Sequence, residues 1–235
     1  MNIIDLHTHI LPQMDDGSKS IEESIEMIDF LKLQNVNKIV FTPHFYASDE
    51  SPKSFLERRE NSYQKLIQSY TFDNVDVLLG AEVYYFSGIG SCEELKRLAI
   101  SDTKHILIEM PYNSWDDNIV QDVINIQNNL KLKVILAHAE RFLRYKNSQK
   151  YIEYLAFNDC LIQVNLDSFT NFAVKRTLYN WVKKDMIFAI ASDCHNMSTR
   201  PANWDKVRPD IIKKIGQSSF KKINKKSEFL FKNKV

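Results

Sequence analysis

Cysteine and glycine are both scarce in this sequence of 235 residues. The three cysteines, Cys92, Cys160 and Cys194, are odd in number and lack CxxC spacing, which argues against a disulfide framework and against a thiolate zinc site. We therefore expect a reducing, cytoplasmic location. Only five glycines are present, and neither GxxxxGK(S/T) nor GxGxxG occurs, so a glycine-rich loop is not what would bind a phosphate group.

An excess of charge and long apolar runs are absent as well. The chain has 31 basic and 30 acidic residues, so no field of the whole protein attracts nucleic acid or an anionic membrane. No window approaches the roughly twenty apolar residues that span a bilayer. Asp5 and His7 interrupt the first apolar segment, which argues against a signal peptide. Recognition of an anion by this protein must therefore be local.

The residues that are present alternate between two patterns from end to end. Short β-branched runs predict seven strands, over 3–7, 38–42, 75–83, 106–109, 133–138, 161–166 and 187–192. Longer amphipathic stretches predict helices over 21–34, 55–70, 92–99, 118–129, 149–157 and 172–184, and a final helix from about residue 209. Ser20, followed by Glu23 three residues later, predicts a capping box at the start of the first helix.

Seven repeats of strand and helix predict one α/β domain over residues 1–235 with a parallel sheet. A closed barrel and a doubly wound open sheet have the same local pattern, so periodicity leaves both open. The last residues, 220–235, are rich in lysine and predict a solvated helix end or a frayed tail.

Histidines and acids gather at the carboxyl ends of the predicted strands. Five of the six histidines lie there, His105 being the exception. The positions are His7, His9, His44, Glu82, Glu109, His138, Asp193 and His195. Because parallel strands end at one edge, these side chains are predicted to converge. Burying so many ionisable groups together without a metal would be costly, so the set predicts a metal centre.

Imidazole and carboxylate ligands without thiolate suit Zn, Mn or Fe, and eight or nine ligands exceed what one tetrahedral ion needs. Two or three ions are therefore expected. Such a centre supplies a hydroxide nucleophile, which predicts hydrolysis. Arg141 and Arg200 follow His138 and His195 on loops above the same edge, where a guanidinium pair would suit a phosphoryl dianion. The alternative for both arginines is pairing with surface acids.

Two further patterns are weaker. Asp5 shares the strand face of His7 and is expected either to orient a ligating histidine or to pair with a neighbouring strand. Cys194 to Arg200 matches Cys-x5-Arg, the spacing of cysteine-dependent phosphatases. No glycine lies between the two residues and Pro201 follows them, so a thiol mechanism is a weak alternative.

Seven motifs occur in a fixed order between residues 2 and 201: HTHILPQMDDGS, TPHF, GAEVYY, LIEMP, HAERF, SDCHN and a following RP. In order and spacing they resemble the bacterial PHP-type (polymerase and histidinol phosphatase) protein-tyrosine phosphatases of capsule and exopolysaccharide synthesis. The resemblance implies a distorted (β/α)7 barrel with three divalent metal ions, manganese being the first expectation and iron or zinc the alternatives. The family commonly has glycine where Gln13 stands.

Carried over motif by motif, the resemblance implies a ligand set. His7, His9 and Asp193 would hold the first ion, with Glu82 bridging to the second; Glu109 and His138 would complete the second, and Asp16, His44 and His195 would hold the third. Arg141 and Arg200 match the arginines that contact phosphate. The implied reaction is direct attack of a metal-bridging hydroxide on phosphotyrosine, and the expected partner is a bacterial tyrosine kinase of the polysaccharide export system.

Three other functions compete with this one. A PHP phosphatase of small phosphomonoesters such as histidinol phosphate, or a phosphodiesterase, would use the same cluster. A metal-dependent amidohydrolase or deoxyribonuclease barrel also starts with HxH, but the Asp15-Asp16-Gly17 motif favours the PHP type. A catalytically inactive, metal-free scaffold would be expected to lack some ligand positions. Several aromatic residues near the strand ends could stack a phenol ring or pack the rim: Phe45, Tyr46, Tyr84, Tyr85, Phe86 and Trp115.

Overall fold

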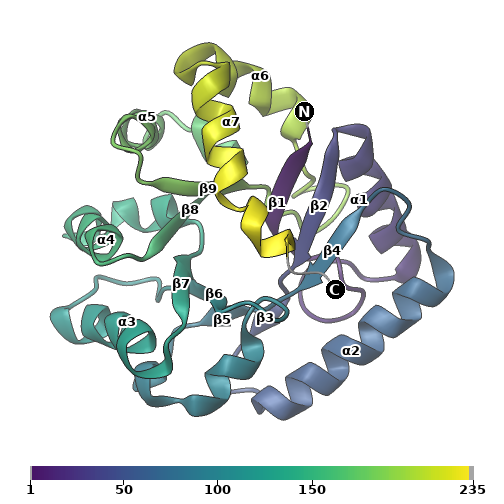
Figure 1. The fold of residues 1–235 in the computed structure, drawn as a ribbon, viewed down its shortest axis with the longest axis horizontal. Helices are drawn as coiled ribbons and strands as arrows, with labels where there is room; N and C mark the ends of the chain where they lie inside the picture. Colours follow the sequence, from purple (N-terminus) through teal and green to yellow (C-terminus); the bar gives the residue numbers. More distant parts are fainter. Residues whose placement is uncertain (1, 233–235) are drawn as a thin grey trace.

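The computed structural model describes residues 2–232, and its strands form a parallel barrel with helices around the outside (Figure 1). Nine short strands lie within that range: β1 (Ile3–Thr8), β2 (Val36–Phe41), β3 (His44–Phe45), β4 (Asp76–Leu79), β5 (Glu82–Tyr84), β6 (His105–Glu109), β7 (Lys133–Leu136), β8 (Leu161–Asn165) and β9 (Ile187–Ala191). Every residue of β1 and β9 is buried, as expected where a parallel sheet is covered on both faces.

Hydrogen bonds divide the strands into two sheets that together close the barrel. The smaller sheet has the order β1-β2-β4 and the larger one β3-β5-β6-β7-β8-β9. The chain of β2 continues into β3 and that of β4 into β5, so the two sheets share two strand positions. At the other junction Thr8 pairs with Cys194, and the N–H of Asp193 donates to the carbonyl oxygen of His7 at 2.9 Å. The result is the predicted distorted (β/α)7 barrel and not the open sheet.

The predicted strand 75–83 is divided into β4 and β5, and the short strand β3 follows just beyond the end of the predicted strand 38–42. Pro43 has no N–H to donate to a neighbouring strand, and it lies in the chain between β2 and β3. On the neighbouring strand, the N–H of Gly80 donates to the carbonyl oxygen of Phe41 at 2.8 Å, and that of Glu82 to Pro43 at 3.0 Å. After the break His44 pairs directly with Glu82. The interruption therefore places two predicted ligands side by side.

Seven α-helices and five 3-10 segments are present among the described residues: α1 (Ile21–Leu33), α2 (Pro52–Ser69), α3 (Asp117–Leu130), α4 (Ser148–Phe157), α5 (Lys175–Lys183), α6 (Trp204–Ile215), α7 (Gln217–Lys226), η1 (Ile89–Ser91), η2 (Glu93–Leu98), η3 (Ala139–Arg144), η4 (Leu166–Thr170) and η5 (Glu228–Phe231). The segment predicted as a helix over 92–99 is the 3-10 segment η2. The final predicted helix begins at Trp204, five residues before Pro209. None of the described helices is long and apolar enough to cross a membrane.

The capping box predicted for α1 is half formed. The side-chain oxygen of Ser20 accepts from the N–H of Glu23 at 3.2 Å, as predicted. The carboxylate of Glu23 accepts from the N–H of Lys19 at 2.8 Å and not from that of Ser20. The N-cap bond alone therefore defines the start of this helix.

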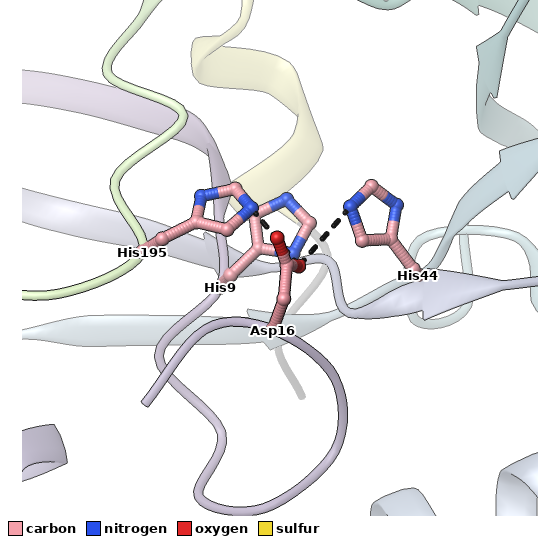
Figure 2. A group of neighbouring side chains, drawn as sticks. All are labelled: His9, Asp16, His44 and His195. Atoms are coloured by element: carbon pink, nitrogen blue, oxygen red, sulfur yellow. Dashed lines mark ion pairs between the residues drawn. The ribbon is translucent and has the colours of Figure 1, made fainter. Parts of the chain in front are cut away.

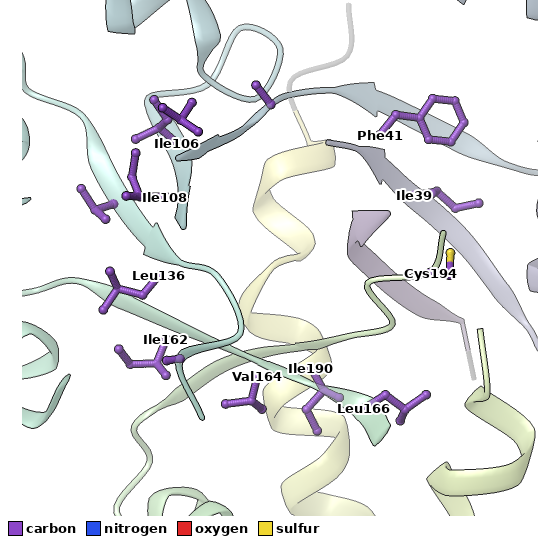
Figure 3. Packing of buried hydrophobic residues seen from close by; sticks show 14 of the residues in the cluster. Ile39, Phe41, Ile106, Ile108, Leu136, Ile162, Val164, Leu166, Ile190 and Cys194 are labelled. Carbon is purple, nitrogen blue, oxygen red and sulfur yellow. The ribbon is translucent and has the colours of Figure 1, made fainter. Parts of the chain in front are cut away.

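Two apolar layers alternate along the strands. Ile106 and Ile108 belong to the large cluster between strands and helices, whereas Leu107 belongs to the smaller cluster inside the barrel. Figure 3 shows members of the outer layer from β2, β6, β7, β8 and β9. Leu230 and Phe231 of η5 join the inner cluster, and Lys226 Nζ donates to the carbonyl oxygen of Ile187 at the start of β9.

The lysine-rich segment is therefore part of the core and not a frayed tail over the residues that the structure describes. Phe220 and Ile223 are 2% and 4% exposed, because α7 turns an apolar face toward the barrel. Lys221, Lys222 and Lys225 of α7 are exposed, as predicted for a solvated helix end, whereas Lys226 is half-buried. Residues 233–235 of the predicted tail lie outside the described residues.

Candidate metal centre

The structure brings all nine predicted ligands to one edge of the barrel, and seven of them form three overlapping groups whose donor atoms lie within 4.8 Å of one another. The groups are His9, Asp16, His44 and His195; His7, His9 and Glu82; and His44, Glu82 and Glu109. His138 adjoins these groups through Glu82, and Asp193 adjoins them through His7. Asp16 is exposed and His44 is half-buried, whereas the other seven are buried. The sixth histidine, His105, starts β6 at the opposite edge.

Glu82 lies at the centre of the cluster. Its Oε2 atom is 3.1, 3.2 and 3.0 Å from ring nitrogens of His7, His9 and His44, yet it accepts no hydrogen bond from any residue in 2–232. The Nε2 atoms of His7 and His9 face each other at 3.2 Å. Burial opposes ionisation of Glu82, but the histidines around it hold the pKa of this carboxyl well below its usual range. Ring nitrogens of three histidines thus converge on a carboxylate oxygen that has no hydrogen-bond partner among the described residues.

The other oxygen of Glu82 links the second part of the cluster. Oε1 lies 2.8 Å from Nε2 of His138, and the same nitrogen is 3.3 Å from Glu109 Oε1. Burial and Arg141 lower the pKa of His138, but contacts with Glu109 and Glu82 outweigh them and raise it to about 9. Asp193 contributes to the part of the cluster around His7, because its Oδ1 atom lies 3.5 Å from Nε2 of that histidine.

Asp16 reaches the cluster from the loop that follows β1 (Figure 2). Its Oδ1 atom is 3.6 Å from Nε2 of His44 and 3.4 Å from Nε2 of His195. The rings of His9 and His195 are stacked with centroids 3.8 Å apart. Burial and the neighbouring His9 lower the pKa of His195 to about 2. Because Nδ1 of this ring lies 2.9 Å from the carbonyl oxygen of Asp193, which can only accept, the proton of the neutral ring belongs on Nδ1 and Nε2 keeps its lone pair.

These observations fit divalent metal ions. Glu82 Oε2, His44 Nδ1 and His195 Nε2 are buried atoms without a hydrogen-bond partner among the described residues, which is costly unless another group satisfies them. All the donors are imidazole nitrogens or carboxylate oxygens, the set that suits Mn, Fe or Zn. The number of donors exceeds the ligand set of a single tetrahedral ion.

Asp15 was not predicted as a site residue, although it lies in the quoted Asp15-Asp16-Gly17 motif. Its Oδ2 atom accepts from Nδ1 of His9 at 2.7 Å and from the backbone N–H of His44 at 2.8 Å. Burial opposes its ionisation, but His9 dominates and lowers the pKa of this carboxyl. A Cβ on Gly17 would lie 2.2 Å from the carbonyl oxygen of His9, so only glycine lets this loop fold back.

Strand β8 supplies no predicted ligand, but its polar residues hold ligands from other strands. Gln163 Oε1 accepts the backbone N–H of His138 at 2.6 Å and lies 3.1 Å from Nδ1 of His7. Its amide nitrogen donates to Asn165 Oδ1 at 2.9 Å, and Asn165 Nδ2 donates to Asp193 Oδ2 at 2.9 Å. Polar residues at alternate positions of an apolar strand are the signal that could have identified this pair.

Asp5 does not contact the ring of a predicted ligand. Its Oδ1 accepts the N–H of Ser192 at 3.0 Å, and its Oδ2 accepts Nε1–H of Trp204 at 2.8 Å. The carboxylate therefore ties β1 to the end of β9 and to α6, which agrees with the alternative of pairing with a neighbouring strand. An irregularity in β1 between Asp5 and Thr8 separates the face of Asp5 from that of His7.

Arg141 and Arg200 converge on one carboxylate oxygen. Both Nη2 groups donate to Asp193 Oδ2, that of Arg200 at 2.9 Å. Arg200 Nη1 also lies 3.8 Å from Asp16 Oδ2. The side chains are 31% and 37% exposed, so they border both the cluster and solvent. Their shared partner is a buried acid of the cluster, and a cleft of about 400 Å³ opens beside them. Thr170 is among the residues that line this cleft.

The predicted aromatic residues separate into two kinds. Phe45 and Trp115 are buried and pack in the core, and Tyr85 donates from its hydroxyl to Asp122. Tyr46 is half-buried beside His44, with ring centroids 5.4 Å apart, and Tyr84 lies 5.6 Å beyond Tyr46. Phe86 packs partly buried against the core.

Tyr112 is an aromatic residue of the site that was not predicted. Its hydroxyl donates to Glu109 Oε1 at 2.6 Å, and its ring lies nearly parallel to that of His138. Together with Tyr46 and Tyr84 it forms the aromatic part of the rim.

Cys194 is unsuited to nucleophilic attack. The residue is 1% exposed, and burial raises the pKa of its thiol to about 12. Its side chain packs in the outer apolar layer (Figure 3). The match of Cys194 to Arg200 with Cys-x5-Arg is therefore a coincidence of spacing.

The fold and the donor cluster together define a barrel of the metal-dependent hydrolase class. Residues 3–229 match the family model described as capsular polysaccharide synthesis, CpsB/CapC, and the chain belongs to this family. The tyrosine-protein phosphatase CpsB of Streptococcus pneumoniae is 29% identical over 94% of both chains.

Solved structures agree with this assignment. Crystal structures of YwqE from Bacillus subtilis and CpsB from Streptococcus pneumoniae, described as unique metal-dependent tyrosine phosphatases, include a chain with a TM-score of 0.82 and 26% identity, covering 99% of this chain and 96% of that one. A phosphotriesterase homology protein from Escherichia coli shares the fold alone, with a TM-score of 0.61 and 8% identity over 98% of this chain and 99% of that one.

Proposed function

We propose that this protein hydrolyses phosphotyrosine in a protein substrate, and that it does so with three divalent metal ions, for which manganese is our first expectation. The observation that carries the proposal is the pair of arginines at Asp193, because it places two guanidinium groups beside a buried cluster of metal donors. The names of the relatives, tyrosine-protein phosphatases, supply the substrate class.

We assign the ligands as follows. The first ion would be held by His7, His9 and Asp193, with Glu82 reaching toward the second; Glu109 and His138 would complete the second, and Asp16, His44 and His195 would hold the third. Ions bound there would supply a nucleophile derived from water at neutral pH and would stabilise charge on the phosphoryl group.

The protein's own residues would bind and orient the substrate. Arg141 and Arg200 would exchange part of their contact with Asp193 for the phosphoryl oxygens, since a planar guanidinium matches two such oxygens at once. Tyr46 and Tyr84 border the cluster at His44 and would line the side of the phenol ring. Asp15 and Gln163 would hold the histidines in place while the substrate binds.

We also propose a tyrosine kinase of capsule or exopolysaccharide export as the substrate protein, supported by the family description. The three free cysteines support the expected cytoplasmic location. The contacts of η5 with the inner cluster support the view that the whole chain works as one catalytic domain.

Hydrolysis of p-nitrophenyl phosphate and of a phosphotyrosine peptide by chelated protein, before and after addition of Mn²⁺, tests this proposal. We expect activity to require Mn²⁺, to fall by at least about a hundredfold in His44→Ala, and to remain in Cys194→Ser. Activity without metal that disappears in Cys194→Ser would overturn the mechanism. Hydrolysis of histidinol phosphate but not of the peptide would favour a small phosphomonoester, and fewer than one bound ion per chain in Mn²⁺ would favour a scaffold.

A further inference from the structure

Helices α5 and α6 lie on the outer wall of the barrel (Figure 1). A groove of about 830 Å³ is lined by residues of both helices. Five of the side chains that line it are cationic, and one, Asp210, is anionic. The cations are Lys175, Arg176 and Lys183 of α5 and Lys213 and Lys214 of α6. Because the whole chain carries a net charge of only +1, this is a local concentration of positive charge.

These cations form no ion pairs in the part of the chain that the structure describes. None of the five makes an ion pair within residues 2–232. Neighbouring lysines differ in this respect, since Lys184 pairs with Glu153, and Lys222 and Lys226 pair with Asp185. Four of the five are exposed and Lys175 is half-buried. The groove is therefore open to an anionic partner.

The groove adjoins the cleft that contains the two arginines. Thr170, the last residue of η4, lines both. Lys175 and Arg176 lie at the first turn of α5, close to this junction along the chain, and Lys183 lies at its last residue. Phe172, 85% exposed, stands between η4 and α5, with Lys175 Nζ 3.5 Å from the centre of its ring. A chain that leaves the cleft past Thr170 would thus enter the groove.

We propose that the α5–α6 groove binds an acidic segment of the protein substrate, next to the phosphotyrosine. This inference rests on the proposed function, because the phosphotyrosine in the cleft anchors the segment. The nine residues of α5 span about 14 Å, which about four residues of extended peptide would cover. Because Thr170 lines both the groove and the cleft with the two arginines, a peptide that carries the phosphotyrosine would contact both at once, which favours a peptide over an anionic bilayer.

Two double variants with the same change of charge test the groove. Lys213→Gln/Lys214→Gln removes two of its cations. Lys221→Gln/Lys225→Gln removes two exposed lysines of α7 that do not line the groove. Each pair is compared with the native protein, loaded with Mn²⁺, on three substrates: a phosphotyrosine peptide with glutamates on both sides, the same peptide with glutamines, and p-nitrophenyl phosphate.

We expect the native protein to prefer the glutamate peptide, and the groove variant to lose about threefold to tenfold in kcat/KM on that peptide alone. Rising ionic strength should diminish the preference. The α7 variant should behave as the native protein does. Equal kcat/KM for the two peptides in the native protein, or an equal loss in both double variants, would overturn the proposal.

Binding separates failure of this proposal from failure of the proposed function. Anisotropy of the fluorescently labelled glutamate peptide with chelated protein reports Kd without turnover. If no substrate is hydrolysed but Kd rises severalfold in the groove variant only, the proposed phosphatase activity is rejected, whereas binding of an acidic peptide by the groove is supported. If the peptides are hydrolysed but Kd is the same in the groove variant as in the native protein, only the proposal that the groove binds the substrate is rejected. Binding of phosphatidylserine vesicles that is lost in this variant, without any effect on peptide, would assign the cations to a membrane instead.

Discussion

One oxygen of Asp15 holds two predicted ligands: it accepts from Nδ1 of His9 at 2.7 Å and from the backbone N–H of His44 at 2.8 Å. The first bond assigns a proton to Nδ1 and leaves Nε2 of His9 directed toward Glu82 and Asp193. The second sets the position of β3 relative to the loop after β1. Asp15 is thus a positioning residue that acts through two others.

Removing this carboxylate should weaken metal binding. In Asp15→Ala, the His9 ring loses the bond that orients it, and we expect the affinity for Mn²⁺ to fall by about 10-fold to 100-fold. Asp15→Asn should recover part of the loss, because its amide oxygen still accepts from Nδ1. Calorimetric titration of chelated protein with Mn²⁺ measures both variants. An unchanged affinity in Asp15→Ala would show that the bond is dispensable.

Gln163 should have two distinct effects, one on the stability of the fold and one on the binding of metal. Gln163→Leu leaves the backbone N–H of His138 buried without an acceptor, which should cost about 1–3 kcal/mol in free energy of unfolding. It also frees Nδ1 of His7. Thermal unfolding with chelator and with Mn²⁺ distinguishes the two effects, since a purely structural role would lower both Tm values equally. We expect the increase of Tm caused by Mn²⁺ to shrink as well.

His105 should make stability depend on pH below neutrality. Burial, with a smaller effect of Lys133, lowers the pKa of His105 to about 4 from its usual value near 6.5. Between these values the unfolded chain binds a proton that the folded chain does not, so the free energy of unfolding falls as pH decreases. In His105→Asn this part of the slope should disappear between pH 6.5 and 4. Urea unfolding at a series of pH values compares the slopes, and identical slopes would contradict the assignment.

Glycine should be more stable than other residues at the position of Gln13. Gln13 adopts φ of 60°, in the left-handed region, where a side chain is strained. Gln13→Gly should therefore be more stable than Gln13→Ala by about 1 kcal/mol, because alanine keeps the Cβ that causes the strain. Chemical unfolding of the two variants measures the difference. Equal stabilities would mean that the loop relaxes around either residue.

The position of the site could be predicted from the sequence because parallel strands bring their carboxyl ends to one edge. His7, Glu109 and Asp193 each end a run of apolar residues, and that alone places them together. The burial of the lysine-rich segment could not be predicted in the same way. Its apolar residues, Phe220 and Ile223, are spaced among lysines, and only the packing of α7 against β9 and α6 in the outer apolar layer explains their burial.

The sequence by itself determined the alternation of strands and helices and most of the donor atoms, since these follow from local periodicity and residue chemistry. Closure of the strands into a barrel does not follow from periodicity, and it was expected only from the resemblance to a known family. The tertiary structure alone decided which residues support the donors. Asp15, Gln163 and Asn165 act through hydrogen bonds whose partners lie on other strands or loops. The same holds for Asp5, which a strand irregularity turns toward α6 and β9. Such contacts depend on register and on closure of the barrel, and neither is encoded within a single segment.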